Sequence, residues 1–267
     1  MEDIMVYFGE FAGTMILIVL GNGVVANVVL AKTKGNNSGW IVIAIGWGLA
    51  VAMAVCITGW ISGAHLNPAV TIALAVTGAG GASMSLMTVF LYVSSQLAGA
   101  IAGSCLVYLN YKNHYDATTD PVAILSTFAT APEIRDYKWN MTSEILGTAM
   151  LVGGILGIGD PHNTTVVFNL GAGAEAVGEI GIFGALVVGC LVCAIGLSMG
   201  GPTGYAINPA RDLGPRIAHA ILPIKGKGSS DWQYSWVPIA GPLLGGILGA
   251  LMYEFGAFIY ESTNAGM

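Results

Sequence analysis

The tripeptide Asn-Pro-Ala occurs twice in this chain and constrains the fold more than any other feature. The copies are Asn67-Pro68-Ala69 and Asn208-Pro209-Ala210, and each follows a glycine-containing segment and precedes a short apolar stretch. Asn is a favoured N-cap residue and Pro is favoured at the first helical position, so each copy predicts the start of a helix. We therefore expect short helices at about 67–77 and 208–222.

The composition indicates that these short helices lie in a membrane. Of 267 residues, 55% are hydrophobic, 9% are charged and 39 are glycine, which excludes an ordinary soluble domain. Six apolar stretches are long enough to cross a hydrocarbon core of about 30 Å as helices, near residues 6–30, 40–60, 84–109, 141–159, 179–200 and 235–260. The two Asn-Pro-Ala helices are too short to cross it, so we expect them to enter the membrane and return.

The segments that lead into the two short helices are predicted to line a pore. Non-helical backbone at membrane depth is tolerated only where protein buries it or where it faces a water-filled cavity. The backbone carbonyls of these segments then face the cavity and replace water around a passing solute. The residues concerned are Gly63, Ala64, His65, Gly204, Tyr205 and Ala206.

The repeat extends beyond the tripeptides. Residues 9–14 (Gly-Glu-Phe-Ala-Gly-Thr) match residues 143–148 (Ser-Glu-Ile-Leu-Gly-Thr) at an offset of 134, and the Asn-Pro-Ala copies are offset by 141. Each half holds three spans and one re-entrant segment, and because three is odd the second half inserts upside down. We expect an all-α membrane protein with a single channel domain over 1–267, made of inverted repeats at about 1–110 and 139–262 joined by a long loop.

These motifs resemble the major intrinsic protein family, the aquaporins and glycerol facilitators, over essentially the whole chain. The glycerol-conducting branch is indicated by Asp212 directly after Arg211, by Leu213-Gly214-Pro215-Arg216 and by Pro238-Ile239. The resemblance implies a passive channel for glycerol, other small uncharged solutes and water that excludes protons and ions. It also implies a homotetramer in the lipid bilayer with cytoplasmic termini, and no cofactor. The compact length indicates a bacterial inner membrane.

By position against the family motif, four residues are expected to form a narrow outer constriction: Trp47, Gly196, Tyr205 and Arg211. The Arg guanidinium offers hydrogen-bond donors to hydroxyl oxygens, and the aromatic faces pack against the CH edge of a polyol. The side chains of Asn67 and Asn208 are expected at the pore centre, where both half-helices direct their positive dipole ends and repel cations. Glycerol facilitators commonly have Phe at Tyr205, so a channel mainly for water, or for protonated hydroxy acids such as lactic acid, is an alternative.

Three ionisable residues in the spans and loops allow two interpretations each. Glu10 and Glu144 occupy the same repeat position, and either they relay protons or they accept backbone N–H bonds from the re-entrant loops. The second interpretation is favoured because no ion-binding cluster surrounds them. His65 is either a pH gate or a hydrogen-bonded loop residue, and the absence of a neighbouring acid in the sequence favours the latter.

Other function classes fit the sequence less well. A secondary transporter also uses inverted repeats with broken helices, and a junctional membrane protein is a third possibility. No nucleophile–base pair or metal spacing indicates an enzyme, and nothing indicates nucleic-acid binding. The basic residues Lys32, Lys34, Lys112, Arg135, Lys138, Lys225 and Lys227 fall in loops that the family topology places outside, which is opposite to the positive-inside rule.

Overall fold

The computed structural model describes residues 2–171, 174–179 and 182–264. Six long helices are α1 (Glu2–Val29), α2 (Trp40–Ser62), α4 (Leu86–Asn110), α7 (Tyr137–Gly159), α9 (Ile182–Met199) and α11 (Val237–Asn264). Within the described ranges, five of these are long and apolar enough to span a membrane by length and composition; the apolar part of α9 is shorter. At about 1.5 Å per residue the 18 residues of α9 still extend about 27 Å.

The two half-helices are α3 (Pro68–Thr77) and α10 (Pro209–Ile221), and both begin where the sequence predicts. In each, the preceding Asn is the N-cap, and its side-chain oxygen accepts the backbone N–H of the Ala two residues later, at 2.9 Å in both cases. Their lengths of 10 and 13 residues correspond to about 15 Å and 20 Å, half the thickness of a bilayer or a little more.

Short elements connect the long helices. They are η1 (Ala79–Gly81), α5 (Lys112–Ala117), α6 (Pro121–Ser126), α8 (Pro161–Thr164), β1 (Thr165–Gly171) and β2 (Ala174–Glu179). The strands form an antiparallel hairpin in which Thr165 pairs with Glu179. The predicted all-α fold is confirmed for the membrane bundle, whereas this hairpin between α8 and α9 was not predicted.

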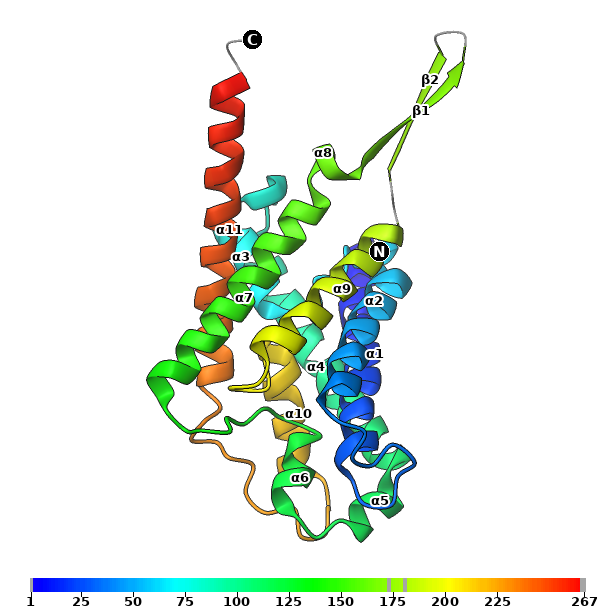
Figure 1. Ribbon diagram of the computed structural model, residues 1–267, viewed down its shortest axis with the longest axis vertical. Helices are drawn as coiled ribbons and strands as arrows, with labels where there is room; N and C mark the ends of the chain where they lie inside the picture. The colour runs from blue at the N-terminus through cyan, green and yellow to red at the C-terminus, as the bar shows by residue number, and fades with distance from the viewer. Residues whose placement is uncertain (1, 172–173, 180–181, 265–267) are drawn as a thin grey trace.

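The helices pack as an inverted repeat requires (Figure 1). Helix α1 packs on α4 as α7 packs on α11, α2 and α9 cross each other, and α10 packs on α4 as α3 packs on α11. Glycines allow two of these close approaches: a Cβ added at Gly99 would lie 2.2 Å from the carbonyl oxygen of Phe11, and one at Gly245 would lie 2.3 Å from that of Ile145. These two glycines therefore allow close packing between helices of the same chain.

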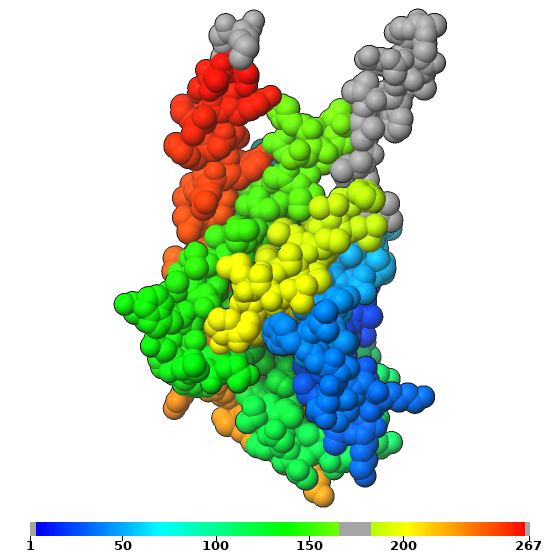
Figure 2. Space-filling view, in the orientation of Figure 1, coloured from blue at the N-terminus to red at the C-terminus, as the bar shows by residue number. Residues whose placement is uncertain are grey.

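The long helices expose many large apolar side chains on the outside of the bundle. The face seen in Figure 2 is covered by α7, α9 and the blue helices of the first repeat, and α11 extends beyond the body of the bundle. On α2, Ile41, Ile45, Leu49, Met53 and Ile57 are exposed at every fourth position and form one continuous stripe. Such a stripe on a helix in water would be costly, so it is suited to contact with lipid or with another apolar surface.

The two ends of the bundle differ. The connections that contain α5 and α6 lie at the end opposite to the chain termini (Figure 1). At the terminal end, Asp160 caps α8 and accepts a hydrogen bond of 2.6 Å from Tyr253 of α11. The hydrogen bonds from Tyr253 and from the backbone and side chain of His162 lower the pKa of the Asp160 carboxyl to about 2. The carboxylate therefore stays charged at neutral pH and ties α8 to α11.

Candidate functional site: a pore between the two Asn-Pro-Ala loops

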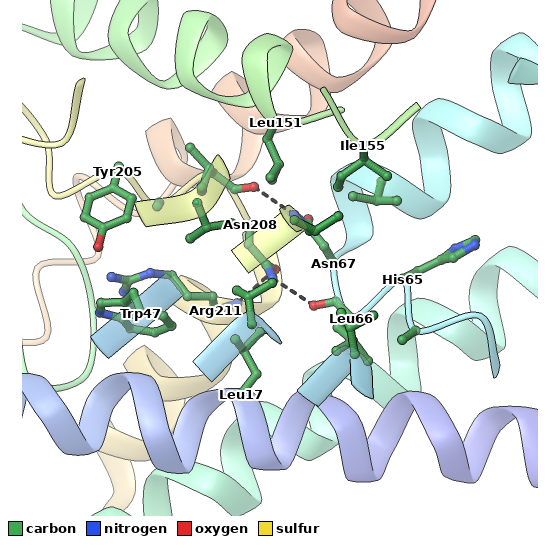
Figure 3. Close-up of a pocket in the computed structure, with 18 of the residues that line it drawn as sticks. Leu17, Trp47, His65, Leu66, Asn67, Leu151, Ile155, Tyr205, Asn208 and Arg211 are labelled. Carbon is green, nitrogen blue, oxygen red and sulfur yellow. Dashed lines mark hydrogen bonds between the residues drawn. The ribbon is translucent and has the colours of Figure 1, made fainter. Parts of the chain in front are cut away.

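A cavity of about 260 Å³ lies where the two loops before the half-helices meet (Figure 3). Apolar side chains from five helices make up much of its wall: Leu17, Val51, Val55, Val70, Leu74, Leu151, Ile155, Val188 and Val192. The polar groups come from both loops and from one face of α2 and α10: Trp47, His65, Asn67, Tyr205, Asn208 and Arg211. An apolar wall with a few placed polar groups is the usual lining of a site for small organic solutes.

The two Asn-Pro-Ala turns hold each other. Asn67 Nδ2 donates to the carbonyl of Ile207 and Asn208 Nδ2 donates to the carbonyl of Leu66, both at 2.8 Å (Figure 3). An amide nitrogen has two N–H groups, so each Asn has one further donor beyond this bond. Each Asn therefore binds the loop of the other repeat, and these two equivalent hydrogen bonds hold the N-termini of α3 and α10 next to each other in the cavity wall.

The loop before α3 is held by the buried carboxylate of Glu10. Its Oε1 accepts the Ser62 hydroxyl at 2.7 Å and the His65 N–H at 2.9 Å. Its Oε2 accepts the Leu66 N–H at 2.8 Å and the side-chain amide of Gln96 at 2.7 Å. Hydrogen bonds to a carboxylate are stronger than neutral ones, so this side chain fixes the loop backbone.

The loop before α10 is held by Glu144 in the same way. Its two carboxylate oxygens accept the N–H groups of Ala206 and Ile207, each at 2.9 Å. These two residues are offset by 141 from His65 and Leu66, whose N–H groups bond to Glu10. The geometry supports the interpretation of both acids as loop supports, because their oxygens are engaged by backbone donors and they lie among buried residues.

The four residues predicted for the outer constriction lie together. The guanidinium carbon of Arg211 is 4.2 Å from the ring centroid of Trp47, a cation–π contact. Tyr205 packs on Gly196, where an added Cβ would lie 2.8 Å from the Tyr205 Cζ atom. Trp40 completes the group: its ring meets Tyr205 edge-on at 5.7 Å and its Nε1 donates to the Gly196 carbonyl at 2.9 Å.

A buried ion pair stands behind this group. Asp212 and Arg216 of α10 are both fully buried, and Arg216 Nε is 2.8 Å from Asp212 Oδ1. The other Arg216 nitrogens donate to the backbone carbonyls of Thr130, Ser230 and Asp231 at 2.8–3.1 Å. Asp212 Oδ2 in turn accepts the Thr130 N–H and hydroxyl at 2.7 Å. The pair therefore joins α10 to the loops on both sides of it.

His65 has local partners. Its Nδ1 is 3.1 Å from the Thr71 hydroxyl, and its ring lies 5.0 Å from that of Tyr92. Glu10 accepts the His65 backbone N–H at 2.9 Å. This packing favours a hydrogen-bonded loop residue over a pH gate.

The structure brings most of the predicted residues to the cavity wall. Gly63, Ala64, His65, Tyr205, Ala206, both Asn residues, Trp47 and Arg211 line it, whereas Gly204 and Gly196 lie outside the lining. Sequence reasoning missed Trp40, Gln96 and Thr130, whose partners are 156, 86 and 82 positions away in the chain. In the part of the chain that the structure describes, no three His, Cys, Asp or Glu residues are grouped as a metal site would need.

Comparison with known proteins identifies the class. The family model described as "Major intrinsic protein" matches residues 2–253, and the chain belongs to this family. It is a family of channels and not of enzymes.

Individual relatives are similar over nearly the whole chain. The "Probable glycerol uptake facilitator protein" of Thermotoga maritima is 57% identical over 250 residues, which cover 94% of this chain and 98% of that protein. The glycerol uptake facilitator protein of Streptococcus pneumoniae R6 is 51% identical, over 92% of this chain and 97% of that protein. The X-ray structure of the aquaglyceroporin from Plasmodium falciparum has a TM-score of 0.78 at 30% identity, over 94% of this chain and 95% of that one.

Proposed function

We propose that this protein is a passive transmembrane channel that conducts glycerol and other small uncharged solutes together with water. The observation that carries the proposal is the meeting of the two Asn-Pro-Ala turns at one cavity with an apolar wall and a few polar groups. Glycerol has the same two-sided character, with CH groups along one edge and hydroxyls along the other. The names of the relatives and of the structural neighbour support glycerol as the solute.

In this proposal Trp47, Gly196, Tyr205 and Arg211 form the selectivity filter. Arg211 donates hydrogen bonds to solute hydroxyls, and the rings of Trp47 and Tyr205 contact the CH edge. The carbonyls of Gly63, Ala64, His65, Gly204, Tyr205 and Ala206 accept hydrogen bonds that the solute loses with water. Leaving such a group unpaired in an apolar setting costs several kcal/mol, so the carbonyls make passage feasible.

Protons and ions are excluded at two places in this scheme. The N-termini of α3 and α10 carry the positive ends of their helix dipoles to Asn67 and Asn208, where cations are repelled. The second N–H of each Asn orients the oxygen of a passing hydroxyl or water. Arg211 adds a full positive charge at the outer side of the same path. No coupling ion takes part.

We further propose one channel domain of two inverted repeats, about 1–110 and 139–262, with four copies in a bacterial inner membrane and each copy holding its own pore. The proposed topology places both termini in the cytoplasm, as the family resemblance implies. The loop cations then lie outside, opposite to the usual bias. Single cysteines in place of Lys34 and Glu261, in a variant lacking the four native cysteines, test this: a membrane-impermeant maleimide added to cells labels position 34 and not position 261.

Stopped-flow light scattering of proteoliposomes tests the channel function. Vesicles with the protein are challenged separately with glycerol and with an impermeant osmolyte, beside empty liposomes. Fast reswelling in glycerol is expected for the wild type. Arg211→Ala is expected to change the glycerol rate because it removes a cavity-lining guanidinium, whereas Arg135→Ala, at an exposed ion pair with Asp231, leaves it unchanged.

Two outcomes would contradict the proposal. Fast water flow without glycerol entry would mean that Tyr205 closes the filter to polyols. Uptake that saturates and depends on an ion gradient would indicate a secondary transporter instead of a channel.

A further inference from the structure

A second cavity, the α1–α4 groove, lies on the outside of the bundle between these two helices and has a volume of about 400 Å³. Most of its wall is apolar, with Val24 and the half-exposed side chains of Leu20 and Leu106. Both helices are long and apolar enough to span a membrane. The groove therefore opens toward the lipid.

The polar groups of the groove gather at one end. Asn27 lies near the C-terminal end of α1, Asn110 is the last residue of α4 and Tyr111 follows it. Asn27 Oδ1 accepts the Gly35 N–H at 3.3 Å, and the amide nitrogen of the same side chain has two further donors. Because both helices end here, this polar end lies at the level of the lipid headgroups.

The loop after α1 brings positive charge to this polar end. The Thr33 hydroxyl donates to the Asn27 carbonyl, so the loop folds back onto the residue whose side chain also binds Gly35. Lys34 lies between these two contacts, is exposed and takes part in no ion pair among the described residues. A cation without a counter-charge therefore lies beside the amide and hydroxyl donors of the groove.

An anionic phospholipid matches this combination. Its acyl chains are as apolar as the groove wall, and basic residues next to a span attract anionic headgroups. The side chains of Asn27, Asn110 and Tyr111 all have donors for phosphate oxygens. Asp116, the first acid after α4, is already neutralised by Lys112. The polar end therefore favours a headgroup with a net negative charge over a zwitterionic one.

Gly23 leaves room in the wall of the groove. It lies in the middle of the α1 residues that line the groove, and a Cβ added there would meet no atom of the described residues within 4 Å. Two residues earlier, a Cβ added at Gly21 would lie 2.3 Å from the Trp47 ring, so packing requires that glycine. Glycine inside a helix costs about 1 kcal/mol relative to Ala, and packing gives no reason for it at Gly23. A bound acyl chain in this open space accounts for the missing side chain.

We propose that the α1–α4 groove binds an anionic phospholipid, with one acyl chain along the apolar wall past Gly23 and the phosphate beside Asn27, Tyr111 and Lys34. This lipid site is separate from the proposed channel function, because the groove and the pore cavity share no described lining residue. In the proposed topology the site lies in the outer leaflet, so basic residues of the outer loops have a partner in the membrane itself.

Native mass spectrometry of the full chain in detergent tests the site. The protein is titrated with phosphatidylglycerol, which is anionic, or with phosphatidylcholine, which is zwitterionic, both with the same acyl chains, and the bound lipids are counted. Gly23→Leu places a side chain in the groove at a position where Leu also favours the helix, and Lys34→Gln removes the cation. The matched controls are Gly157→Leu, at a glycine of α7 with open space around it, and Lys225→Gln, at an exposed lysine of another loop.

The wild type is expected to bind phosphatidylglycerol more tightly than phosphatidylcholine. Gly23→Leu is expected to lose this lipid, because its side chain occupies the space of the acyl chain, whereas Gly157→Leu keeps it. Lys34→Gln is expected to lower the preference for phosphatidylglycerol about fivefold, which corresponds to about 1 kcal/mol for one cation at the headgroups, and Lys225→Gln leaves the preference unchanged.

Equal binding of the two lipids by the wild type overturns the inference, and so does an unchanged preference in Lys34→Gln. Retention of phosphatidylglycerol by Gly23→Leu, or its loss from both leucine variants, also overturns it, because binding then does not depend on the groove. A changed oligomeric state of Gly23→Leu in the same spectra overturns it by assigning the groove to contact between copies of the chain. Glycerol entry tests the channel separately, and its absence leaves the lipid site standing.

Discussion

The loop before α3 and the loop before α10 have nearly the same backbone and very different side chains. At three pairs of positions offset by 141, both loops have positive φ angles: 78° and 79° at Gly63 and Gly204, 50° and 37° at Ala64 and Tyr205, and 51° and 45° at Leu66 and Ile207. Left-handed conformations cost non-glycine residues about 1–2 kcal/mol each, so both loops depend on their surroundings to hold them.

The side chains at equivalent positions explain why the proposed filter lies at one end of the cavity. Ala64 and Val70 of the first loop and α3 correspond to Tyr205 and Arg211 of the second half. Thr71 corresponds to Asp212, the acid of the buried ion pair. The two halves share a repeated loop backbone, and Tyr205 and Arg211 of the second half join Trp47 of the first half in the proposed selectivity filter.

The largest expected loss of stability comes from removing the Asp212–Arg216 ion pair, which the second half has and the first half lacks. Arg216→Ala leaves the buried Asp212 unpaired and frees three backbone carbonyls, so it is expected to lower the free energy of unfolding by about 3–5 kcal/mol. The double variant Asp212→Thr/Arg216→Ala imports the residues of the first half, Thr71 and Ala75, and removes the unpaired charge. Unfolding by SDS in mixed micelles measures both.

The double variant is expected to be more stable than Arg216→Ala by about 2 kcal/mol, since no charge remains buried alone. An Arg216→Ala protein as stable as the double variant would mean that Asp212 does not depend on its partner, and the contrast between the halves would then lie elsewhere.

A smaller loss of stability is expected from changing the carboxylates that hold the loops in both halves, Glu10 and Glu144. Glu10→Gln and Glu144→Gln each turn one acceptor oxygen into a donor that faces a backbone N–H. Both are expected to lower the free energy of unfolding by about 2 kcal/mol, the value of one hydrogen bond to a charged group. Ser62 and Gln96 at Glu10 can reorient, so they add little to the difference.

The same SDS unfolding measures these variants, with Glu261→Gln at an exposed position of α11 as the control. If only one of the two substitutions lowers the free energy of unfolding, the two carboxylates do not contribute equally to holding the loops.

Much of this comparison was predictable from the sequence. Hydropathy predicted the six long helices, and the Asn-Pro-Ala copies predicted where α3 and α10 begin, because capping is set by residues next to each other in the chain. The filter residues followed from the family resemblance, and the structure places Trp47, Tyr205 and Arg211 on one cavity.

The remaining features depend on contacts that no local pattern encodes. In the sequence, Asp212 is recognisable only as a marker of the glycerol branch. Its bonds to Thr130, and the bonds of Arg216 to backbone carbonyls, link segments far apart in the chain. Every residue has a backbone carbonyl, so the sequence does not predict which carbonyls accept hydrogen bonds from Arg216. The sequence likewise does not predict the hairpin of β1 and β2, which lies almost entirely between the predicted spans 141–159 and 179–200.

A third prediction concerns how the half-helices end. Helix α3 ends at Thr77 and is capped by Gly78, whose φ of 71° is left-handed and whose N–H donates to the Leu74 carbonyl at 2.9 Å. Gly78→Ala is expected to cost about 1 kcal/mol of unfolding free energy through this φ alone, because an added Cβ would meet only the Ala82 carbonyl oxygen, at 3.9 Å. Gly59→Ala, inside α2, is the control and should cost nothing. Equal stability of the two variants would indicate that the α3 end tolerates other conformations.

Helix α10 ends differently, and this gives the smallest expected effect. Lys227 Nζ donates to the carbonyls of His219, Ala220 and Leu222, each at 2.7 Å, and places a positive charge at the negative end of the helix dipole. Because this site is partly exposed, Lys227→Met is expected to cost only about 0.5 kcal/mol. Lys225→Met, two residues away and exposed, should have no effect under the same SDS unfolding. If both changes are neutral, the Lys227 charge adds nothing to the stability of the α10 C-terminus, and the two half-helices differ in their packing and not in how their ends are capped.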